Sequence, residues 1–157
     1  MMKRLALILI LITAALVSLQ CAAANPLKKA KKGAKEVSFV TLKNYYVRNE
    51  IPCSRPLQLI LDREEDFQKV FGPAAIMGGA PTDIDWKRQF VVAVLLPETN
   101  KPTMVTPMKV KQSPGNVIFY YQVNTGSKTK HKLVPFAAVA LERSADAQQM
   151  QVFFIED

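Results

Sequence analysis

The chain has 157 residues, of which 21 are basic and 13 acidic, so its formal net charge is +8. Most of this excess lies in the first 36 residues, because residues 37–157 contain 14 basic and 12 acidic residues. A domain of that length can build one hydrophobic core but not two. It also lacks the basic face interleaved with aromatic residues that a nucleic-acid-binding protein needs. We therefore expect one nearly neutral domain that does not bind nucleic acid.

Residues 1–24 have the pattern of an export signal. Lys3 and Arg4 provide a short cationic start, and residues 5–19 form an almost unbroken apolar run that small residues follow. The run is shorter than the roughly 20 apolar residues of a membrane-spanning helix. The sequence thus predicts export from the cytoplasm, which argues against a nucleotide-driven cytosolic enzyme.

Two processing sites are compatible with this signal. Cleavage before Cys21 would leave a cysteine that can be lipidated, although Gln20 replaces the small residue that usually precedes such a cysteine. Cleavage after Ala24 would remove Cys21 and release a soluble product that begins at Asn25. We expect either an outer-membrane lipoprotein, held to the membrane only through Cys21, or a periplasmic or secreted protein.

Residues 25–36 are strongly basic, with five lysines and one acidic residue. They have no apolar periodicity, which is typical of a solvated linker. We expect this linker to act as a spacer lying over anionic lipid.

The remainder, residues 37–157, has the pattern of a mainly β domain. Residues 39–47 and 57–61 are rich in β-branched, aliphatic and aromatic side chains, as strands are, and residues 90–96 form a continuous apolar run typical of a strand buried on both faces. Further strands are expected at residues 104–111, 117–123, 133–143 and 149–155. The first two of these form a hairpin around residues 113–116, and the last two form a final hairpin. In residues 104–111 the alternation places Met104, Thr106, Met108 and Val110 on one side.

One helix is expected at about residues 62–71. Asp62 can cap its first turn, and Glu65 three residues later completes a capping box. An apolar face at helical spacing follows, and Gly72 and Pro73 end the helix. Together the elements predict a compact antiparallel β-barrel or sandwich of about seven strands with one α-helix at one end.

The residue types offer little chemistry. The single histidine, His131, lies among lysines that disfavour a bound cation, and no zinc-ligand spacing accompanies it. A nucleophilic pair of Cys53 and His131 lacks a recognisable orienting group and oxyanion loop. We therefore expect a binding protein rather than an enzyme, with no metal and no other cofactor.

The best candidate for a binding surface is the proline-flanked segment 51–56. Prolines have a fixed φ and restrict the preceding residue to extended geometry. A loop that is already extended loses little entropy when it enters a peptidase cleft. Cys53 and Arg55 are expected to be displayed, unless the segment merely connects two strands; residues 77–83 are a second candidate loop. The candidate inhibitory residues are Ile51, Pro52, Cys53, Ser54, Arg55 and Pro56.

Two segments carry a resemblance to known families. Residues 64–72 (EEDFQKVFG) and 84–94 (IDWKRQFVVAV) resemble small exported proteins of the protease-complex-subunit-B-like group, in which a capped helix precedes an aromatic and valine-rich strand. They are also similar, more loosely, to the potempins, small β-barrel lipoproteins that inhibit secreted peptidases. The resemblance covers mainly residues 57–96. It departs from the first group at residues 99–102, where that group has a Gly-Gly-Tyr segment.

These observations predict an exported inhibitor, lipid-anchored if Cys21 is retained, that blocks a secreted or envelope peptidase with its extended loop. Cys53 as thiolate could approach a zinc ion, whereas Arg55 could enter the acidic specificity pocket of a serine enzyme. Because the resemblance includes metallopeptidase inhibitors, we slightly favour a metallopeptidase as target over a serine peptidase. The alternative is a non-inhibitory envelope module that stabilises or scaffolds a protein partner. The sequence does not indicate an oligomeric state.

Overall fold

The most apolar segment of the chain forms the central strand of the fold. The computed structural model describes residues 25–74, 79–143 and 150–157, and in it strand β6 spans Gln89–Leu95. Residues 90–95 are at most 1% exposed. Successive side chains of a strand point to opposite faces, and here residues 91, 93 and 95 enter one hydrophobic cluster while residues 90, 92 and 94 enter another. The prediction of a strand buried on both faces is confirmed.

Strand β6 lies in the middle of a four-stranded antiparallel sheet with the order β2-β9-β6-β4. Its companions are β2 (Val40–Thr41), β9 (Phe136–Glu142) and β4 (Leu57–Leu61). Strand β9 repeats the alternation of β6, with residues 138 and 140 in one cluster and residues 137, 139 and 141 in the other. This central sheet therefore needs a covering layer on each face.

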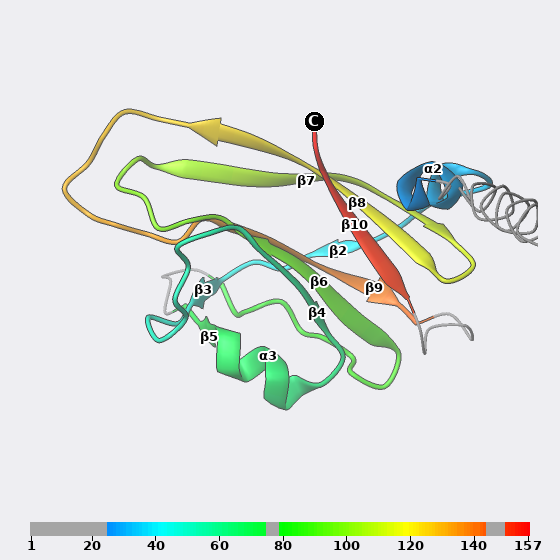
Figure 1. Cartoon of the computed structure of the whole chain (residues 1–157). Helices are drawn as coiled ribbons and strands as arrows, with labels where there is room; N and C mark the ends of the chain where they lie inside the picture. The colour runs from blue at the N-terminus through cyan, green and yellow to red at the C-terminus, as the bar shows by residue number, and fades with distance from the viewer. Residues whose placement is uncertain (1–24, 75–78, 144–149) are drawn as a thin grey trace, which may run out of the picture.

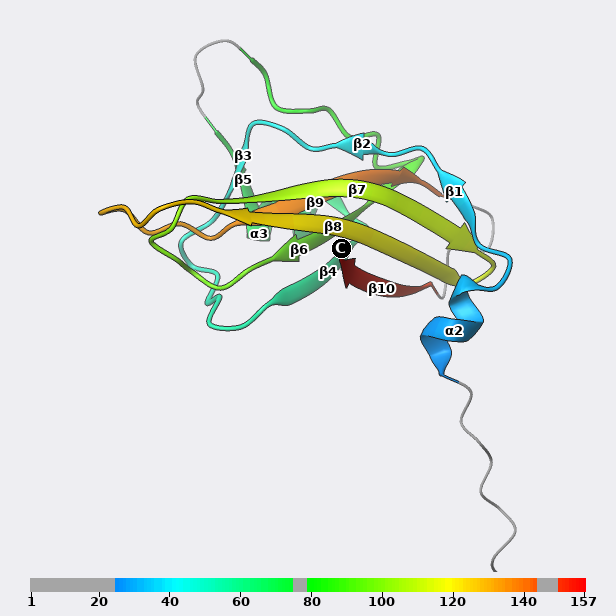
Figure 2. The same ribbon diagram turned by 90° about the horizontal axis from the view of Figure 1, so that it is seen from above.

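The first covering layer is a second four-stranded sheet with the order β1-β7-β8-β10, which lies over the central sheet in Figures 1 and 2. Its strands are β1 (Lys35–Val37), β7 (Thr103–Ser113), β8 (Asn116–Thr125) and β10 (Gln151–Glu156). β7 and β8 form the predicted hairpin, in which Gly115 adopts a φ of 71° that suits glycine. The two sheets form a sandwich and are not closed into a barrel, so the mainly β prediction is confirmed in its sandwich form.

The second covering layer is built from α3 (Glu64–Val70), β3 (Tyr45–Val47) and β5 (Phe71–Pro73), which lie on the other face of the central sheet in Figure 1. Its centre is Phe67, whose ring centroid lies 5.0 Å from that of Tyr45, 4.9 Å from that of Phe71 and 5.4 Å from that of Trp86. The helix begins and ends within the predicted range, and it passes directly into β5.

The predicted cap of this helix is wrong. The residue before the helix is Arg63, which makes no side-chain capping hydrogen bond. The carboxylate of Asp62 instead accepts a hydrogen bond from Arg143 Nη1 at 3.2 Å, a partner 81 residues away. A tertiary ion pair has thus replaced the local capping contact.

The predicted final hairpin is also wrong. β9 belongs to the central sheet, whereas β10 pairs in parallel with β8 in the other sheet, so that sheet is mixed rather than antiparallel. β9 has no free edge for β10, because β6 occupies one side of it and β2 the other. The expected strand start at residue 149 and the connection expected before it, residues 144–148, lie outside the described residues.

The basic segment 25–36 is not the structureless linker that we expected. Residues Pro26–Lys31 form helix α2, which Asn25 caps by accepting a hydrogen bond from the amide of Leu27 at 3.1 Å. Ala30 is 1% exposed and packs with Ile118 and Tyr120 of β8. The segment is therefore docked on the β1-β7-β8-β10 sheet, which we call the outer sheet.

Among the described residues, no helix has both the length and the hydrophobicity to cross a bilayer. The apolar run at residues 5–19 and the candidate lipidation site Cys21 both lie outside the described residues.

Candidate functional site

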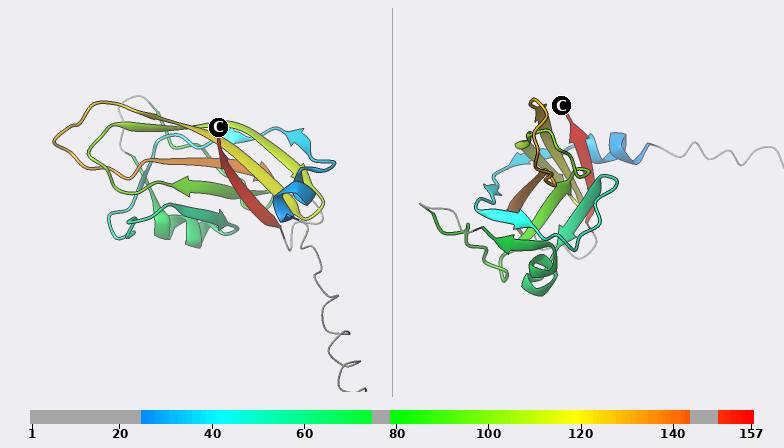
Figure 3. Two further views of the ribbon diagram at one scale, coloured as in Figure 1. Left: turned by 45° about the horizontal axis from the view of Figure 1, so that its top comes forward. Right: turned by 90° about the vertical axis from the view of Figure 1, so that its left-hand side faces the viewer.

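Three loops meet at one end of the sandwich, and together they form what we call the loop end. They are residues 49–56 between β3 and β4, residues 96–102 between β6 and β7, and residues 126–135 between β8 and β9. Figure 1 shows them on the left, with α2 at the right, and the 45° view in Figure 3 has the same arrangement. β4 and β9 begin where the antiparallel β6 ends, which places these loops side by side.

Backbone hydrogen bonds join the three loops. The amide of Glu98 donates to the carbonyl of Cys53 at 3.0 Å, linking the first loop to the second. Thr99 and Leu133 exchange two hydrogen bonds of 2.9 Å, and the amide of Thr129 donates to the carbonyl of Asn100 at 2.6 Å. The loop end is therefore a connected structure rather than three independent loops.

The structure places the candidate inhibitory residues in two environments. Ile51 packs against the hydrophobic cluster beneath α3, and Cys53 is only 7% exposed within that cluster. The expectation that Cys53 is displayed is wrong, because Cys53 is the residue that anchors the loop. The exposed residues of the segment are Pro52, Ser54, Arg55 and Pro56.

The thiol of Cys53 is held by backbone carbonyls. Its Sγ lies 3.1 Å from the carbonyl oxygen of Leu96 and 3.6 Å from that of Arg55. Burial disfavours the thiolate and raises the pKa of Cys53 above its ordinary value. A protonated thiol that donates to a carbonyl is suited to fixing the loop and poorly suited to ligating zinc or attacking a substrate.

An open cavity of about 850 Å³ lies beside the anchored loop. All three loops contribute to it, and strand β3 and the start of β9 complete its wall. Tyr46, Ile51 and Phe136 supply apolar surface, while Glu98 and Lys132 form an ion pair of 3.1 Å at its rim. Such a recess can receive a side chain of a partner that docks on the loop.

The other residues considered from the sequence do not form a reactive site. His131 is exposed in the third loop, and Cys53 is hydrogen-bonded to carbonyls rather than to it. Among the described residues, no group of three or more histidine, cysteine or acidic side chains is placed to hold a metal ion.

The second candidate loop, residues 77–83, is described only from residue 79. Its described part is tied to the start of β3, where Asn44 Nδ2 donates to the carbonyl of Ala80 at 3.0 Å and the hydroxyl of Tyr45 donates to that of Thr82 at 2.8 Å. Pro81 and Asp83 also line a cavity with Phe67, so this part of the loop belongs to the layer of α3.

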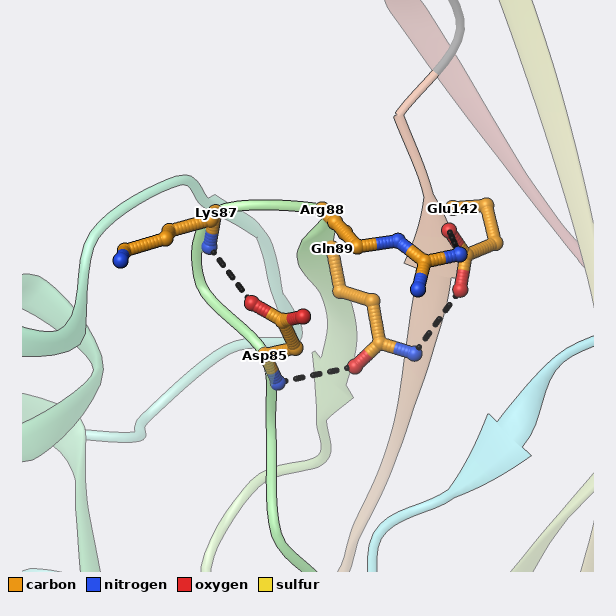
Figure 4. Close-up of polar contacts among 5 residues, drawn as sticks. All are labelled: Asp85, Lys87, Arg88, Gln89 and Glu142. Atoms are coloured by element: carbon orange, nitrogen blue, oxygen red, sulfur yellow. Dashed lines mark hydrogen bonds and ion pairs between the residues drawn. The ribbon is translucent and has the colours of Figure 1, made fainter.

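A second polar cluster lies before β6, at the end of this strand that is remote from the loop end, and Figure 4 shows its contacts. Asp85 accepts a hydrogen bond from the amide of Lys87 at 3.1 Å, and its own amide donates to Gln89 Oε1 at 3.1 Å. Gln89 Nε2 and Arg88 reach Glu142 of β9 at 3.3 and 3.6 Å. Every carboxylate of this cluster has a partner, so the cluster fixes a turn and joins two strands.

The sequence reasoning missed the third loop as part of the site. Of residues 126–132 only His131 was considered, as a metal ligand or catalytic partner, although Lys128, Lys130 and Lys132 lie beside it. The dense run of basic residues was the available signal, but its proximity to residue 53 follows only from the antiparallel pairing of β6 and β9.

Comparison with known proteins gives no match among family models, curated proteins or solved structures.

Proposed function

We propose that the chain is an exported peptidase inhibitor, lipid-anchored if Cys21 is retained, that blocks a secreted endopeptidase with the exposed part of its 51–56 loop. The observation that carries the proposal is an exposed arginine, Arg55, on a loop that is fixed from below. Among the described residues, the guanidinium of Arg55 has no hydrogen-bond or ion-pair partner. It is therefore available to a partner.

The stiffness of the loop supports an inhibitory role. Pro52 and Pro56 restrict the backbone, and Cys53 is held through its thiol and through its carbonyl. β4 begins immediately after Pro56, so that the exposed residues lie between two fixed points. A loop of this kind loses little conformational entropy on binding, which favours tight occupation of a cleft.

The geometry changes the class of target that we favour. The zinc-directed hypothesis required Cys53 as a displayed thiolate, and the burial of this side chain removes that support. Arg55 remains, and a guanidinium is suited to bidentate pairing with a carboxylate. The proposed target is accordingly a serine endopeptidase whose specificity pocket is acidic.

The test is a titration of the purified chain against a panel of secreted serine and metallopeptidases with casein as substrate. We expect inhibition at a near-stoichiometric ratio of a serine enzyme that cleaves after basic residues. Arg55→Ala should weaken this inhibition at least about 30-fold, as expected for an interface residue that contributes about 2 kcal/mol. The matched control is Arg88→Ala, which removes an exposed arginine before β6, away from the loop end, and should inhibit normally.

Two results would contradict this proposal in different ways. Unchanged inhibition by Arg55→Ala would remove the loop from the mechanism but leave the function. Absence of inhibition throughout the panel would favour the non-inhibitory envelope module that stabilises or scaffolds a protein partner.

A further inference from the structure

We infer that the whole loop end, and not Arg55 alone, is a basic docking surface for an acidic protein surface, namely the rim around the cleft of the target peptidase. This inference rests on the proposed function and names the chemistry of the partner. It assigns a role to the lysines of the second and third loops.

Within residues 37–157 the excess of positive charge lies at this end, while segment 25–36 forms a second basic region at the α2 end. The three loops contain five basic residues and two acidic ones, while the rest of residues 37–157 contains nine basic and ten acidic residues. One of the two acidic residues, Glu98, is already paired with Lys132. Among the described residues, four of the basic side chains make no ion pair; they are Arg55, Lys101, Lys128 and Lys130.

The lysines are carried on a fixed backbone. The hydroxyl of Thr129, which lies between Lys128 and Lys130, donates to the carbonyl of Asn100 at 3.0 Å, and its amide donates to the same carbonyl. The amide of Gly126 donates to the carbonyl of Pro102 at 2.7 Å. Charges on such a preformed surface can complement a fixed pattern of opposite charge at little entropic cost.

An apolar spot lies beside the lysines. Met104 is 68% exposed and Leu133 is 38% exposed, and both line a shallow cavity of about 520 Å³ with Pro102 and Gly126. Apolar side chains surrounded by charged groups are the usual composition of a protein–protein interface, whose centre excludes water while its rim stays polar. This favours a protein over a simple polyanion as the partner.

The position of α2 argues against a lipid surface as the partner. Helix α2 lies at the opposite end of the sandwich from the loops, as Figures 1 and 2 show, and its lysines are exposed. Membrane attachment through the segment before Asn25, Cys21 included, would hold the α2 end toward the lipid. The loop end would then face away from the membrane, toward a partner in solution.

A basic docking surface should affect the rate of association with the peptidase rather than the affinity of the formed complex. A basic end attracts an acidic partner before contact, and this attraction weakens as salt screens it. Reversal of two lysines, Lys128→Glu with Lys130→Glu, should lower the association rate with the inhibited peptidase at least about tenfold at low salt. The same change at the other end, Lys28→Glu with Lys29→Glu, alters the net charge equally and should lower the rate less than about threefold.

The experiment follows the onset of inhibition by stopped flow for the full chain and both variants, from about 0.02 to about 0.3 M NaCl, with thermal unfolding as a check on folding. Equal slowing by the two double variants, or no slowing by either, would overturn the inference and leave the proposed function standing. An absence of inhibition by the unaltered chain across the panel would overturn the proposed function and the inference with it. Loss of binding to phosphatidylserine vesicles by the loop variant, with an unchanged association rate, would assign the loop end to lipid and also overturn it.

Discussion

At the scale of single residues, Cys53 shows how a side chain's role depends on what lies under it. A cysteine between two prolines has the local sequence of a displayed residue, yet a thiol is small and apolar enough to enter a core. Here the side chain of Cys53 is buried in the hydrophobic cluster beneath α3, and its thiol donates a hydrogen bond to the carbonyl of Leu96. The loop therefore presents Arg55 because Cys53 is turned inward.

The first prediction concerns the reactivity of this thiol. Because burial raises the pKa of Cys53, the folded protein holds less thiolate at pH 8 than the unfolded chain does. Alkylation of Cys53 should be at least about tenfold slower in the native protein than in urea, since the thiolate is the nucleophile and the site is closed to reagent. Mass spectrometry of the labelled peptides separates Cys53 from Cys21.

The pH dependence of this reaction has a defined sign. The neutral thiol contributes its stability fully below the unfolded pKa, near 9.0, and that contribution is lost as the pH rises through the higher folded value. The native alkylation rate should therefore begin to rise at a higher pH than the rate in urea. Equal rates in both states would mean that the loop is open and that Cys53 does not anchor it.

At the scale of elements, the sequence predicted correctly those helices and strands whose pattern of apolar and turn residues lies entirely within the element. β6 and the β7–β8 hairpin were found because their apolar runs and their turn are local features. The side-chain alternation of β7 was misjudged, because Met104 and Met108 are exposed while Val110 is buried. The cause is a register shift between Pro107 and Lys109, where a proline that cannot donate to a ladder interrupts the pairing.

Helix α2 was missed for a related reason. Only one residue of this six-residue helix, Ala30, is buried, so no apolar periodicity can be read from the segment. Its docking depends on contacts with Ile118 and Tyr120, and on a hydrogen bond of 3.2 Å from Ser113 Oγ to the carbonyl of Ala30. These partners lie more than 80 residues away along the chain.

The second prediction tests this docking. Ala30→Asp would place a carboxylate where a methyl group is buried without a polar partner, so α2 should detach from the sheet. Trypsin should then cleave at the lysines of residues 28–35 at least about tenfold faster than in the native chain, because local release frees the backbone around these exposed lysines to enter the protease cleft. Cleavage sites and rates are read by mass spectrometry.

A control separates docking from charge. Lys29→Asp introduces the same carboxylate at an exposed position of the same helix and should leave cleavage at the remaining lysines nearly unchanged. If Ala30→Asp gave the same digestion rate as the unaltered chain, α2 would be free in solution and the original linker prediction would stand.

At the scale of the whole molecule, the central sheet lies between two covering layers and packs against both. Leu95 faces the cluster beneath α3, whereas Phe119 of β8 belongs to the cluster between the two sheets. β6 and β9 contribute alternate residues to both clusters. Loss of packing in one cluster should therefore destabilise the other, and the domain should unfold as one cooperative unit.

The third prediction follows from this arrangement. Leu95→Ala should lower the free energy of unfolding by about 2–5 kcal/mol and Phe119→Ala by about 3–5 kcal/mol, because each leaves a cavity in a closely packed core. Trp86, the only tryptophan, lies beside Phe67 and reports on the α3 side. Its fluorescence and the circular dichroism should change together in urea for both variants. Leu133→Ala, at an exposed site, should cost less than about 0.5 kcal/mol.

A result in which Phe119→Ala shifted the circular dichroism midpoint but left the Trp86 midpoint in place would contradict this view. The two clusters would then be separate cooperative units, and the loop end could loosen on the α3 side while the outer sheet stayed folded.

The sequence by itself determined the mainly β class, the doubly buried strand β6, the β7–β8 hairpin and the existence of α3. Each of these is indicated by a local periodicity or by turn residues. The tertiary structure alone decided the pairing of β10 with β8, the docking of α2 and the ion pair of Asp62 with Arg143 in place of a helix cap. It also decided the composition of the loop end. The physical reason is that edges, anchors and charge clusters form between residues far apart in the chain, and no local pattern records which distant surface is available to them.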